Sequence, residues 1–416
     1  MSGWSFMEKL LNGVEVEWKE LGEVGEFLRG KRFVKTDMIS EGVPCIHYGE
    51  MYTHYGVWAT ESKSFINKEL ASKLRVASHG DVVIVAAGET IEDIGNGTAW
   101  LGENDVVIHD ACFSYTSNFN PKYLSYFLRT NLFNDQIKKH ISSGKISAIN
   151  AKGLSKAKAP IPCPENPKKS LEIQAEIVRI LDTFTELTTE LTTELTARKK
   201  QYNYYRDQLM SFEEGEVEWK TLGEVGDFTY GYVAKAQDHG DARFVRITDI
   251  NTNGKLIVTG SKYVDISKEN ERFILKKNDL LMARTGATYG KTMIFEEDYP
   301  AIYAGFLIKL SFDEKVINSK FYWHFAQSNL FWNQANNLVS GGGQPQFNAN
   351  ALKVVKMPIP SLAEQERIVA ILDKFDALTS SITEGLPREI ALRQQQYEYY
   401  RDLLLSFPKP DTEVAA

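Results

Sequence analysis

The segments of this chain that resemble catalytic or nucleotide-binding motifs each depart from the pattern that their chemistry needs. The stretch from Gly286 to Thr292 follows an apolar run, as a phosphate-binding loop would, but only three residues separate its glycines where the motif requires four. Gly341-Gly342-Gly343 precedes Gln-Pro-Gln-Phe instead of a helix start, which argues against a dinucleotide fingerprint. Asn120-Pro121-Lys122-Tyr123 lacks the second proline of an amino-methyltransferase loop. We therefore interpret the chain as non-catalytic, with no cofactor of its own.

The sequence lacks the common metal-binding and redox motifs. The seven histidines contain no HExxH motif, and the three cysteines, Cys45, Cys112 and Cys163, have no CxxC spacing. The acidic residues between positions 89 and 93 are more simply a solvated loop than the carboxylate cluster of a nuclease. These patterns predict no metal site, and the scattered cysteines fit a reducing compartment.

Length and charge limit the remaining classes of function. A chain of 416 residues with 43% hydrophobic content can form two or three domains, each with its own core. It has no run of 18 apolar residues and no secretory signal, so we expect a cytoplasmic protein without a membrane partner. The net charge of −7 is unevenly distributed, because residues 31–158 carry +2 and 232–356 carry +4 whereas the remainder carries −13. The two positive regions permit phosphate binding without demonstrating it.

The chain is an internal repeat with a period of roughly 200 residues, far longer than a solenoid unit. Four segments of the first half return in the second: Glu15–Gly25 as Glu216–Gly226, Pro160–Pro162 as Pro358–Pro360, Ile177–Asp182 as Ile368–Asp373, and Gln201–Asp207 as Gln396–Asp402. The stretches 31–158 and 232–356 share only sparse positions, such as Asp81 with Asp279. The pattern is typical of two similar frames that hold two different recognition surfaces.

Each of these two inserts has the pattern of a mixed α+β domain. Apolar runs bounded by Gly, Asn and Asp at 81–88 and 279–283 predict strands. The segments 125–128 and 322–326 predict short amphipathic helices.

A long helical pattern follows each Pro-Ile-Pro segment. In the first, apolar residues recur at steps of three and four, which predicts one helix from Leu171 to Phe212, roughly 60 Å long. This helix contains a tandem Thr-Thr-Glu-Leu repeat at 188–195, and one added unit would move its ends apart by about 6 Å. The second helix begins near Leu362 with a stripe that reaches Ile382, and Gly385-Leu386-Pro387 should break or kink it. The two stripes can pack against each other; two unrelated surface helices are the alternative.

Together these features resemble the specificity (S) subunit of type I restriction–modification enzymes over nearly the whole chain. The resemblance is carried by Val16-Glu17-Trp18-Lys19-Glu20-Leu21-Gly22, Ala283-Arg284-Thr285-Gly286, Gly342-Gly343-Gln344-Pro345-Gln346-Phe347-Asn348, Pro358-Ile359-Pro360 with Glu364-Gln365-Glu366-Arg367-Ile368-Val369, and Tyr204-Tyr205-Arg206-Asp207. The Thr-Thr-Glu-Leu repeat is similar to the spacer repeats of the type IC branch. No single segment is diagnostic, but the combination is specific.

The resemblance implies an α+β fold with an internal pseudo-two-fold duplication: two globular, mixed α/β target-recognition domains joined by two long antiparallel helices that form a coiled-coil spacer. Each domain would read one half of a split, asymmetric sequence in double-stranded DNA. The helices would set the gap between the half-sites and dock two modification (methyltransferase) subunits. Those partners would bind S-adenosylmethionine, and restriction (translocase) subunits would use ATP and Mg, so no cofactor is expected in this chain.

The corresponding division of the chain has six parts. We predict an N-terminal segment at 1–12, a first target-recognition domain at 13–162, a linker and spacer helix at 163–212, a second target-recognition domain at 213–360, a long C-terminal helix with a kink near Pro387 at 361–407, and a tail at 408–416.

Candidate DNA-binding residues follow from the chemistry of loops, since glycine-rich backbone can approach phosphates and polar side chains reach base edges. We predict contacts by His47, Tyr48, Lys145, Ser147 and Asn150 in the first domain, and by Arg246, Arg284, Thr285, Lys291, Gln344, Gln346 and Asn348 in the second. The alternative is that Asn150 and Asn348 cap helices and that the loop glycines simply make turns. The first domain departs from the family pattern, because Ser-Gly-Lys-Ile-Ser replaces Gly-Gly-Gln-Pro-Gln and Ala-Ala-Gly replaces Arg-Thr-Gly.

The aromatic residues near the ends of the two helices have another predicted role. We assign Tyr202, Tyr205, Arg206, Tyr397, Tyr400 and Arg401 to helix packing or a subunit interface, not to base stacking. Two other functions stay open at this point. One is a duplicated protein-interaction scaffold without sequence-specific DNA binding, and the other is a self-sufficient methyltransferase or nuclease, which the missing motifs disfavour.

Overall fold

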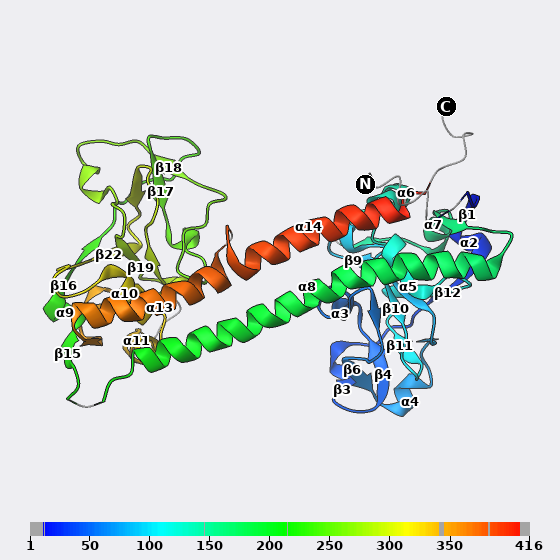
Figure 1. Ribbon diagram of the computed structural model, residues 1–416, viewed down its shortest axis with the longest axis horizontal. Coiled ribbons are helices and arrows are strands. Elements are labelled where there is room, and N and C mark those ends of the chain that lie inside the picture. The colour runs from blue at the N-terminus through cyan, green and yellow to red at the C-terminus, as the bar shows by residue number, and fades with distance from the viewer. Residues whose placement is uncertain are drawn as a thin grey trace. The chain divides into compact units, whose positions relative to one another are not determined.

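The computed structural model describes residues 11, 13–144, 146–213, 215–340, 345–381 and 383–407, and the chain divides into two compact units. Unit 1 draws on residues 1–189 and 392–416, and unit 2 on residues 190–391. Helices α8 (Pro167–Leu209) and α14 (Gly385–Leu405) each contribute residues to both units (Figure 1). The predicted class, two mixed α/β domains joined by long helices, is confirmed.

Unit 1 contains two five-stranded sheets and two small ladders. The first sheet has the order β2 (Gly25–Arg29), β12 (Cys112–Ser117), β8 (Val82–Val85), β10 (Gly97–Trp100), β5 (Trp58–Ala59), and the second has the order β3 (Met38–Ile39), β6 (Ser64–Ile66), β4 (Val43–Ile46), β11 (Val106–Ile108), β7 (Val76–Ala77). The ladders pair β1 (Val16–Glu20) with β14 (Lys158–Pro162), and β9 (Ala87–Gly88) with β13 (Ser147–Ala148). The short helices are α2 (Leu21–Val24), α3 (Tyr48–Thr53), α4 (Lys68–Ala71), α5 (Pro121–Phe127), α6 (Asn131–Lys138) and α7 (Ala151–Ser155). The apolar run predicted as a strand at 81–88 therefore contains the central strand β8, which is buried on both faces.

Unit 2 repeats the main features of this plan. A four-stranded sheet has the order β16 (Gly226–Tyr230), β22 (Leu307–Phe312), β19 (Leu280–Ala283), β20 (Thr292–Ile294), and a three-stranded sheet has the order β18 (Tyr263–Val264), β17 (Ala242–Val245), β21 (Ala301–Tyr303). A ladder joins β15 (Glu218–Thr221) to β23 (Lys356–Ile359). The helices are α9 (Leu222–Val225), α10 (Ser319–Phe325), α11 (Asn329–Leu338), α12 (Ala349–Lys353) and α13 (Leu362–Ser380). The strand predicted at 279–283 is β19.

The most similar repeated segments, those around the two Val-Glu-Trp-Lys sequences, form equivalent antiparallel ladders. Trp18 of β1 lies opposite Pro160 of β14, and Trp219 of β15 lies opposite Pro358 of β23. Each ladder thus joins the start of a domain to the Pro-Ile-Pro segment at its end. Proline is tolerated in such short, two-stranded ladders because each strand has a free edge.

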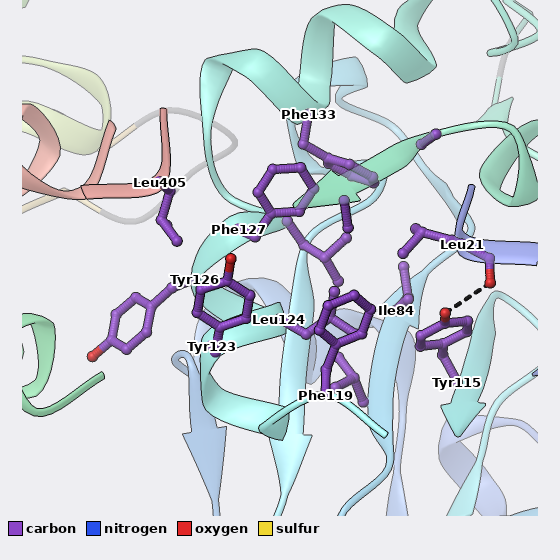
Figure 2. Packing of buried hydrophobic residues seen from close by; sticks show 14 of the residues in the cluster. Leu21, Ile84, Tyr115, Phe119, Tyr123, Leu124, Tyr126, Phe127, Phe133 and Leu405 are labelled. Atoms are coloured by element: carbon purple, nitrogen blue, oxygen red, sulfur yellow. Dashed lines mark hydrogen bonds between the residues drawn. The ribbon is translucent and has the colours of Figure 1, made fainter. Parts of the chain in front are cut away.

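The core of unit 1 shows why two of the predicted short helices are not amphipathic. Tyr123, Leu124, Tyr126 and Phe127 of α5 are all buried, packed with residues of the first sheet on one side and with Leu405 of α14 on the other (Figure 2). The same holds for α10, in which residues 321–325 are all buried. The prediction of an exposed polar face was wrong for both helices because long-helix residues cover that face.

The two long helices match their predicted positions closely. The expected helix from Leu171 to Phe212 is α8, which begins at Pro167 and ends at Leu209. The second pattern begins at Leu362 as predicted, and the break falls between Ser380, where α13 ends, and Gly385, where α14 begins with a φ of 75°. Ile382, which the pattern placed on the apolar stripe, lies outside the described residues.

In unit 1, the α/β domain docks on α8 through polar contacts that surround the core. Lys122 and Tyr126 of α5 donate to the two carboxylate oxygens of Asp182, both at 2.8 Å. The side-chain carbonyl of Gln174 accepts a hydrogen bond from the backbone N–H of Asn120, which itself caps α5. These contacts fix the angle at which α5 meets α8.

Unit 2 uses the same contacts with one difference. Lys320 of α10 donates to Asp373 at 2.8 Å, and Gln365 accepts from the backbone N–H of Asn318 at 2.9 Å. The position of Tyr126 is taken by His324, whose Nε2 lies 2.9 Å from Asp373 Oδ1. The repeated aspartates seen in the sequence therefore hold each domain against a long helix.

Candidate nucleic-acid interface

In unit 2, the two loops that carry most of the predicted DNA contacts are joined to each other. The backbone of Thr285 pairs with that of Gln346, and the Gln346 amide donates to the Thr285 hydroxyl at 2.7 Å. Gly286 N–H donates to the carbonyl of Pro345 at 3.0 Å, and Phe347 N–H donates to the carbonyl of Arg284 at 2.8 Å. The segment after β19 and the segment before α12 thus form one surface.

Unit 1 builds the same junction from different side chains. Ile149 N–H donates to the carbonyl of Ala86 at 2.8 Å, at the place equivalent to the Phe347–Arg284 bond. The strands β9 and β13 pair Gly88 with Ser147. The two units therefore share this backbone frame but differ in side chains, since unit 2 has Arg284 where unit 1 has Ala86.

A second loop position is also equivalent in the two units. His47 follows β4 and Arg246 follows β17, and the backbone N–H of each donates to a capping carboxylate, that of Glu50 at 2.9 Å and that of Asp249 at 2.9 Å. The Arg246 guanidinium also forms a bidentate pair with Asp249, at 2.8 and 3.1 Å. This pairing holds Arg246 beside the backbone and limits its reach to a base edge.

Two glycines that the sequence reading did not select are needed where the sheets meet. A Cβ at Gly30 would collide with the backbone carbonyl of His109, and one at Gly231 would collide with that of Ala304. The sequence feature that could have identified these two glycines is their equivalent position, directly after β2 and directly after β16.

In unit 1, His47 and Tyr48 lie at a hollow of about 460 Å³. Its wall includes the exposed cations Arg29, Arg32 and Lys35. The rings of His47 and Tyr48 are 4.6 Å apart, and each lies within 5.0 Å of the ring of His109. The three cations were not selected from the sequence, although they are close together in it.

Electrostatics keep the histidines of this hollow neutral. Burial lowers the pKa of His47, and the nearby His109 lowers it further. Burial also lowers the pKa of His109. His47 uses its Nδ1 to accept from Gly49 N–H at 3.2 Å, so this histidine serves as a helix cap. The charged side chains that line the hollow are therefore Arg29, Arg32 and Lys35 together with Glu89 and Asp110.

The surroundings of Arg284, in unit 2, leave its guanidinium accessible to a ligand. It lies over the rings of Tyr230 and Phe306, at 5.2 and 5.3 Å, and donates through Nε to the carbonyl of Gly305 at 3.2 Å. Phe306 and Tyr230 are exposed at 56% and 44%, which leaves an aromatic, cationic surface open to solvent. Of the described candidates, Arg284 has the environment that best fits nucleic-acid binding.

The other predicted contacts divide by their environment. Asn150 and Asn348 cap α7 and α12, as the alternative interpretation held. Ser147 and Thr285 are buried at 5% and 2% exposure, so their side chains shape the loops. Lys291 lies at the start of β20, where it lines a hollow beside α8. Lys145 and Gln344 lie outside the described residues.

The aromatic residues near the helix ends are largely packed within their own units. Tyr202, Arg206 and Tyr397 are buried, with Tyr202 stacked on Phe375 at 6.0 Å. Tyr205, 41% exposed, also stacks on Phe375.

The remaining members of this set lie in unit 1. Tyr400 stacks on Phe184 at 5.3 Å, and Arg401 forms an ion pair with Asp402 at 2.8 Å. The neighbouring Tyr204 and Tyr399 are more exposed, at 61% and 62%. Burial thus supports the packing role for the predicted set, and the interface role stays a prediction.

The end of the Tyr-Tyr-Arg-Asp motif has a function that the sequence reading missed. Asp207 accepts hydrogen bonds from the backbone and side chain of Asn329, at 3.0 and 2.6 Å, and Asp402 accepts from the side chain of Asn131 at 3.0 Å. Each aspartate fastens a long helix to the first turn of a domain helix. Asn131 and Asn329 occupy matching places in the two halves, which was the available signal.

Metal-binding groups and membrane-spanning helices were both absent from the part of the chain that the structure describes. No group of three or more His, Cys, Asp or Glu side chains within them could hold a metal ion. In the same part of the chain, no helix is long and apolar enough to cross a membrane. Fold and loops together define a duplicated recognition protein whose two surfaces share a frame and differ in side chains.

The comparisons with known proteins place this recognition protein in a family. The model of the type I restriction modification DNA specificity domain matches residues 13–199 and again 214–392. The type I restriction enzyme EcoR124I/EcoR124II specificity subunit of Escherichia coli is 38% identical, with 99% of each chain covered. The putative type I restriction enzyme specificity subunit S.HindORF215P of Haemophilus influenzae is 33% identical, with 97% of this chain and 98% of that one covered. The chain belongs to the family of type I restriction–modification specificity subunits, and is thus a non-catalytic subunit for DNA sequence recognition.

Solved structures support the fold. The S subunit of a type I restriction–modification system from M. genitalium has a TM-score of 0.52 at 14% identity, covering 96% of this chain and 98% of that one. A chain from a study of complex assembly and conformational transition in the type I R-M system has a TM-score of 0.61 at 14% identity, covering 94% and 97%.

Proposed function

We propose that each recognition domain reads one half of a bipartite, asymmetric site in double-stranded DNA through its pair of joined loops. The observation that carries the proposal is the shared junction, with Phe347 bonded to Arg284 in unit 2 and Ile149 to Ala86 in unit 1. A common backbone frame presents different side chains, so the two domains select different bases.

The proposed contacts are those predicted from the sequence, with roles assigned by environment. Arg284, Gln346 and Lys291 in unit 2, and Tyr48 in unit 1, are accessible enough to reach DNA. Arg246 acts mainly near the phosphates, because Asp249 holds its guanidinium. The remaining members of the set contribute loop shape or backbone contacts: His47, Ser147, Asn150, Thr285 and Asn348. Lys145 and Gln344 stay in the proposal on sequence grounds alone.

The long helices set the gap between the half-sites and dock two modification (methyltransferase) subunits. In this proposal S-adenosylmethionine is bound by those partners, whereas ATP and Mg are used by restriction subunits that join a larger cytoplasmic complex. The exposed Tyr204 and Tyr399 are natural additions to the predicted interface set, because they project from repeated positions of α8 and α14. The six-part division of the chain, with recognition domains at 13–162 and 213–360, is part of the same proposal.

The test is a DNA selection on the full chain co-expressed with its modification subunit, repeated at several salt concentrations. We expect enrichment of two different short sequences separated by a fixed gap. Affinity should fall steeply with salt while the enriched sequences stay the same, because phosphate contacts position the protein without selecting sequence.

The competing function, an interaction scaffold, makes a different prediction in the same experiment. It requires DNA affinity without an enriched motif, and no change when the modification subunit is supplied. Either result would overturn the proposal of split-site recognition.

A further inference from the structure

A polar hollow of about 270 Å³ lies within unit 2, between α8 and the recognition domain. Lys199, Asn203 and Arg206 line it from α8, and Lys291 and Gln327 line it from the domain. Positions 199, 203 and 206 are spaced by four and three residues, which places the three side chains on one face of the helix. The lining contains three cations, and none of its described residues is a carboxylate.

No ion pair neutralises the three cations within the described part of the chain, although Arg206 also lies over the ring of Tyr202, 5.2 Å from its centroid. None of Lys199, Arg206 and Lys291 takes part in an ion pair there. Arg206 is only 8% exposed, and its Nε has no hydrogen-bond partner among the described residues. A buried guanidinium is costly unless its donors are satisfied, and its planar arrangement of donors matches phosphate. The hollow is therefore preorganised for an anion.

The position of Lys291 is fixed by the backbone. Its carbonyl accepts from Ala283 N–H at 2.9 Å, and its N–H donates to the carbonyl of Thr288 at 3.1 Å. Lys291 is thereby held at the end of the loop that begins with Arg284 and Thr285. Its neighbours in the hollow are neutral amides, Asn203 and Gln327, which can donate to an oxyanion without repelling it.

Unit 1 lacks this arrangement, although its frame is the same. Asn96 stands where unit 2 has Lys291, as its carbonyl accepts from Val85 N–H at 3.0 Å in the equivalent bond. By the same repeat that aligns Tyr202 with Tyr397, Gln394 stands in place of Lys199.

The corresponding region of unit 1 contains a different cation, Arg129, and an arginine that is ion-paired, Arg401. Arg129 occupies the position of Gln327, and its guanidinium donates to the carbonyls of Gly56 and Gly97 at 2.8 and 3.0 Å. Arg401, the counterpart of Arg206, is paired with Asp402 at 2.8 Å. Arg129 forms no ion pair among the described residues and its Nε has no hydrogen-bond partner there, so this region of unit 1 holds one unpaired cation where unit 2 holds three.

We propose that the hollow lined by Lys199, Arg206 and Lys291 is a phosphate-binding site found in unit 2 and not in unit 1. The phosphate group comes either from the DNA backbone or from a small phosphorylated molecule. Only the DNA source rests on the proposed function, because binding of a small phosphate would not require sequence recognition.

The first arm of the test titrates inorganic phosphate into the full chain by calorimetry, with chloride replaced at constant ionic strength. The variant is Lys199→Gln with Lys291→Asn, which installs the residues that unit 1 uses and spares the buried Arg206. We expect the phosphate affinity to fall at least about tenfold, because two charge-assisted hydrogen bonds are lost. The control is Lys200→Gln with Lys268→Asn, which removes the same charge from exposed positions outside the hollow and should leave the affinity unchanged.

The second arm measures DNA affinity against salt concentration for the same proteins in complex with the modification subunit. A logarithmic salt slope that is shallower by about one in the hollow variant, and not in the control, assigns the site to a backbone phosphate. An unchanged slope together with lost inorganic phosphate binding assigns it to a small phosphorylated molecule.

The proposal is overturned when the hollow variant matches the control in both arms. Loss of sequence-specific DNA binding by the unaltered chain would instead count against the proposed function, and the phosphate titration would still decide the site. Comparable thermal unfolding of the two variants shows that neither result comes from misfolding.

Discussion

The imidazole Nε2 of His324 lies 2.9 Å from Oδ1 of Asp373, at the point where the second recognition domain docks on α13. Its Nδ1 lies 3.0 Å from the hydroxyl of Tyr202 on α8. Burial lowers the pKa of His324, since the ring is fully enclosed. A neutral ring satisfies both contacts, with Nε2–H donating to Asp373 and Nδ1 accepting from Tyr202.

This contact predicts that unit 2 loses stability in mild acid. The pKa of His324 in the folded chain is below its unfolded value of about 6.5, so the unfolded chain binds the proton first as the pH falls. The stabilisation is complete above pH ~6.5 and decreases from there toward the folded-state pKa, by up to about 1.4 kcal/mol for each pH unit. Urea unfolding followed by proteolysis within residues 319–380, at pH 7.5 and 5.5, measures the change.

The repeat supplies the matched variants for this prediction. His324→Tyr installs the residue that unit 1 carries at Tyr126, and it should abolish the loss in this pH range. His54→Tyr changes an exposed histidine and should leave the loss intact. An undiminished pH dependence in His324→Tyr would show that another group is responsible.

The contacts of Gln365 predict that this single neutral side chain contributes strongly to the free energy of unfolding. It is fully buried, accepts from Asn318 N–H at 2.9 Å, and donates to the carbonyls of Val316 and Pro360, both at 2.9 Å. Gln365→Leu keeps the volume but leaves these buried backbone groups unpaired, so we expect a loss of about 2–4 kcal/mol in the free energy of unfolding. The measurement is urea denaturation, with Glu366→Leu on the exposed face of α13 as the control. Equal stability of the two variants would refute the docking role of Gln365.

The order of the main helices and strands could be predicted from the sequence because the two halves of the chain repeat it. Apolar periodicity located α8 and α13 to within a few residues, and the break before α14 followed from the backbone chemistry of Gly385 and Pro387. The repeated aspartates, Asp182 and Asp373, were visible as a pattern. Their role was not, because it depends on side chains from α5 and α10 that are distant in the sequence.

The candidate site was predicted less completely, for a physical reason. The Arg284 and Gln346 loops were both expected to contact DNA, but which of their side chains face solvent depends on backbone bonds that no local pattern specifies. Asn348 has the side-chain chemistry of a residue that contacts bases, but in the structure it caps a helix. Arg29 and Arg32 were not predicted, because exposed arginines are common and their type alone does not indicate a site. Burial, which follows from tertiary packing, decides between these roles.

Arg284 predicts a change in specificity restricted to one half-site. Its guanidinium is stacked on Tyr230 and Phe306 and is not tied to a described carboxylate, so it is free to donate to a base. Arg284→Ala should cost about 1–3 kcal/mol of discrimination at a position in the half-site read by unit 2. Competition binding with single-base substitutions in both half-sites measures it.

A matched arginine in the same domain serves as the control for that prediction. Arg272 also lies over an aromatic ring, that of Phe273 at 4.7 Å, but it belongs to the turn Glu271–Phe273 and not to either of the joined loops. Arg272→Ala should leave discrimination unchanged at both half-sites. If Arg284→Ala weakens binding to all sequences equally, its contact is with phosphate and not with a base.

The Thr-Thr-Glu-Leu repeat predicts that the recognised gap can be lengthened without changing what is recognised. Residues 188–195 lie inside α8, so one more unit after Leu195 adds about 6 Å of helix. Because base pairs in DNA are about 3.4 Å apart along each strand, the preferred gap should grow by one or two base pairs with both half-sites unchanged. Replacing Thr192 and Thr193 by alanine keeps the length of the helix, and it should leave the gap as it is. Selection on a DNA library with variable gaps tests both variants, and an altered half-site in the insertion variant would refute the spacer role of α8.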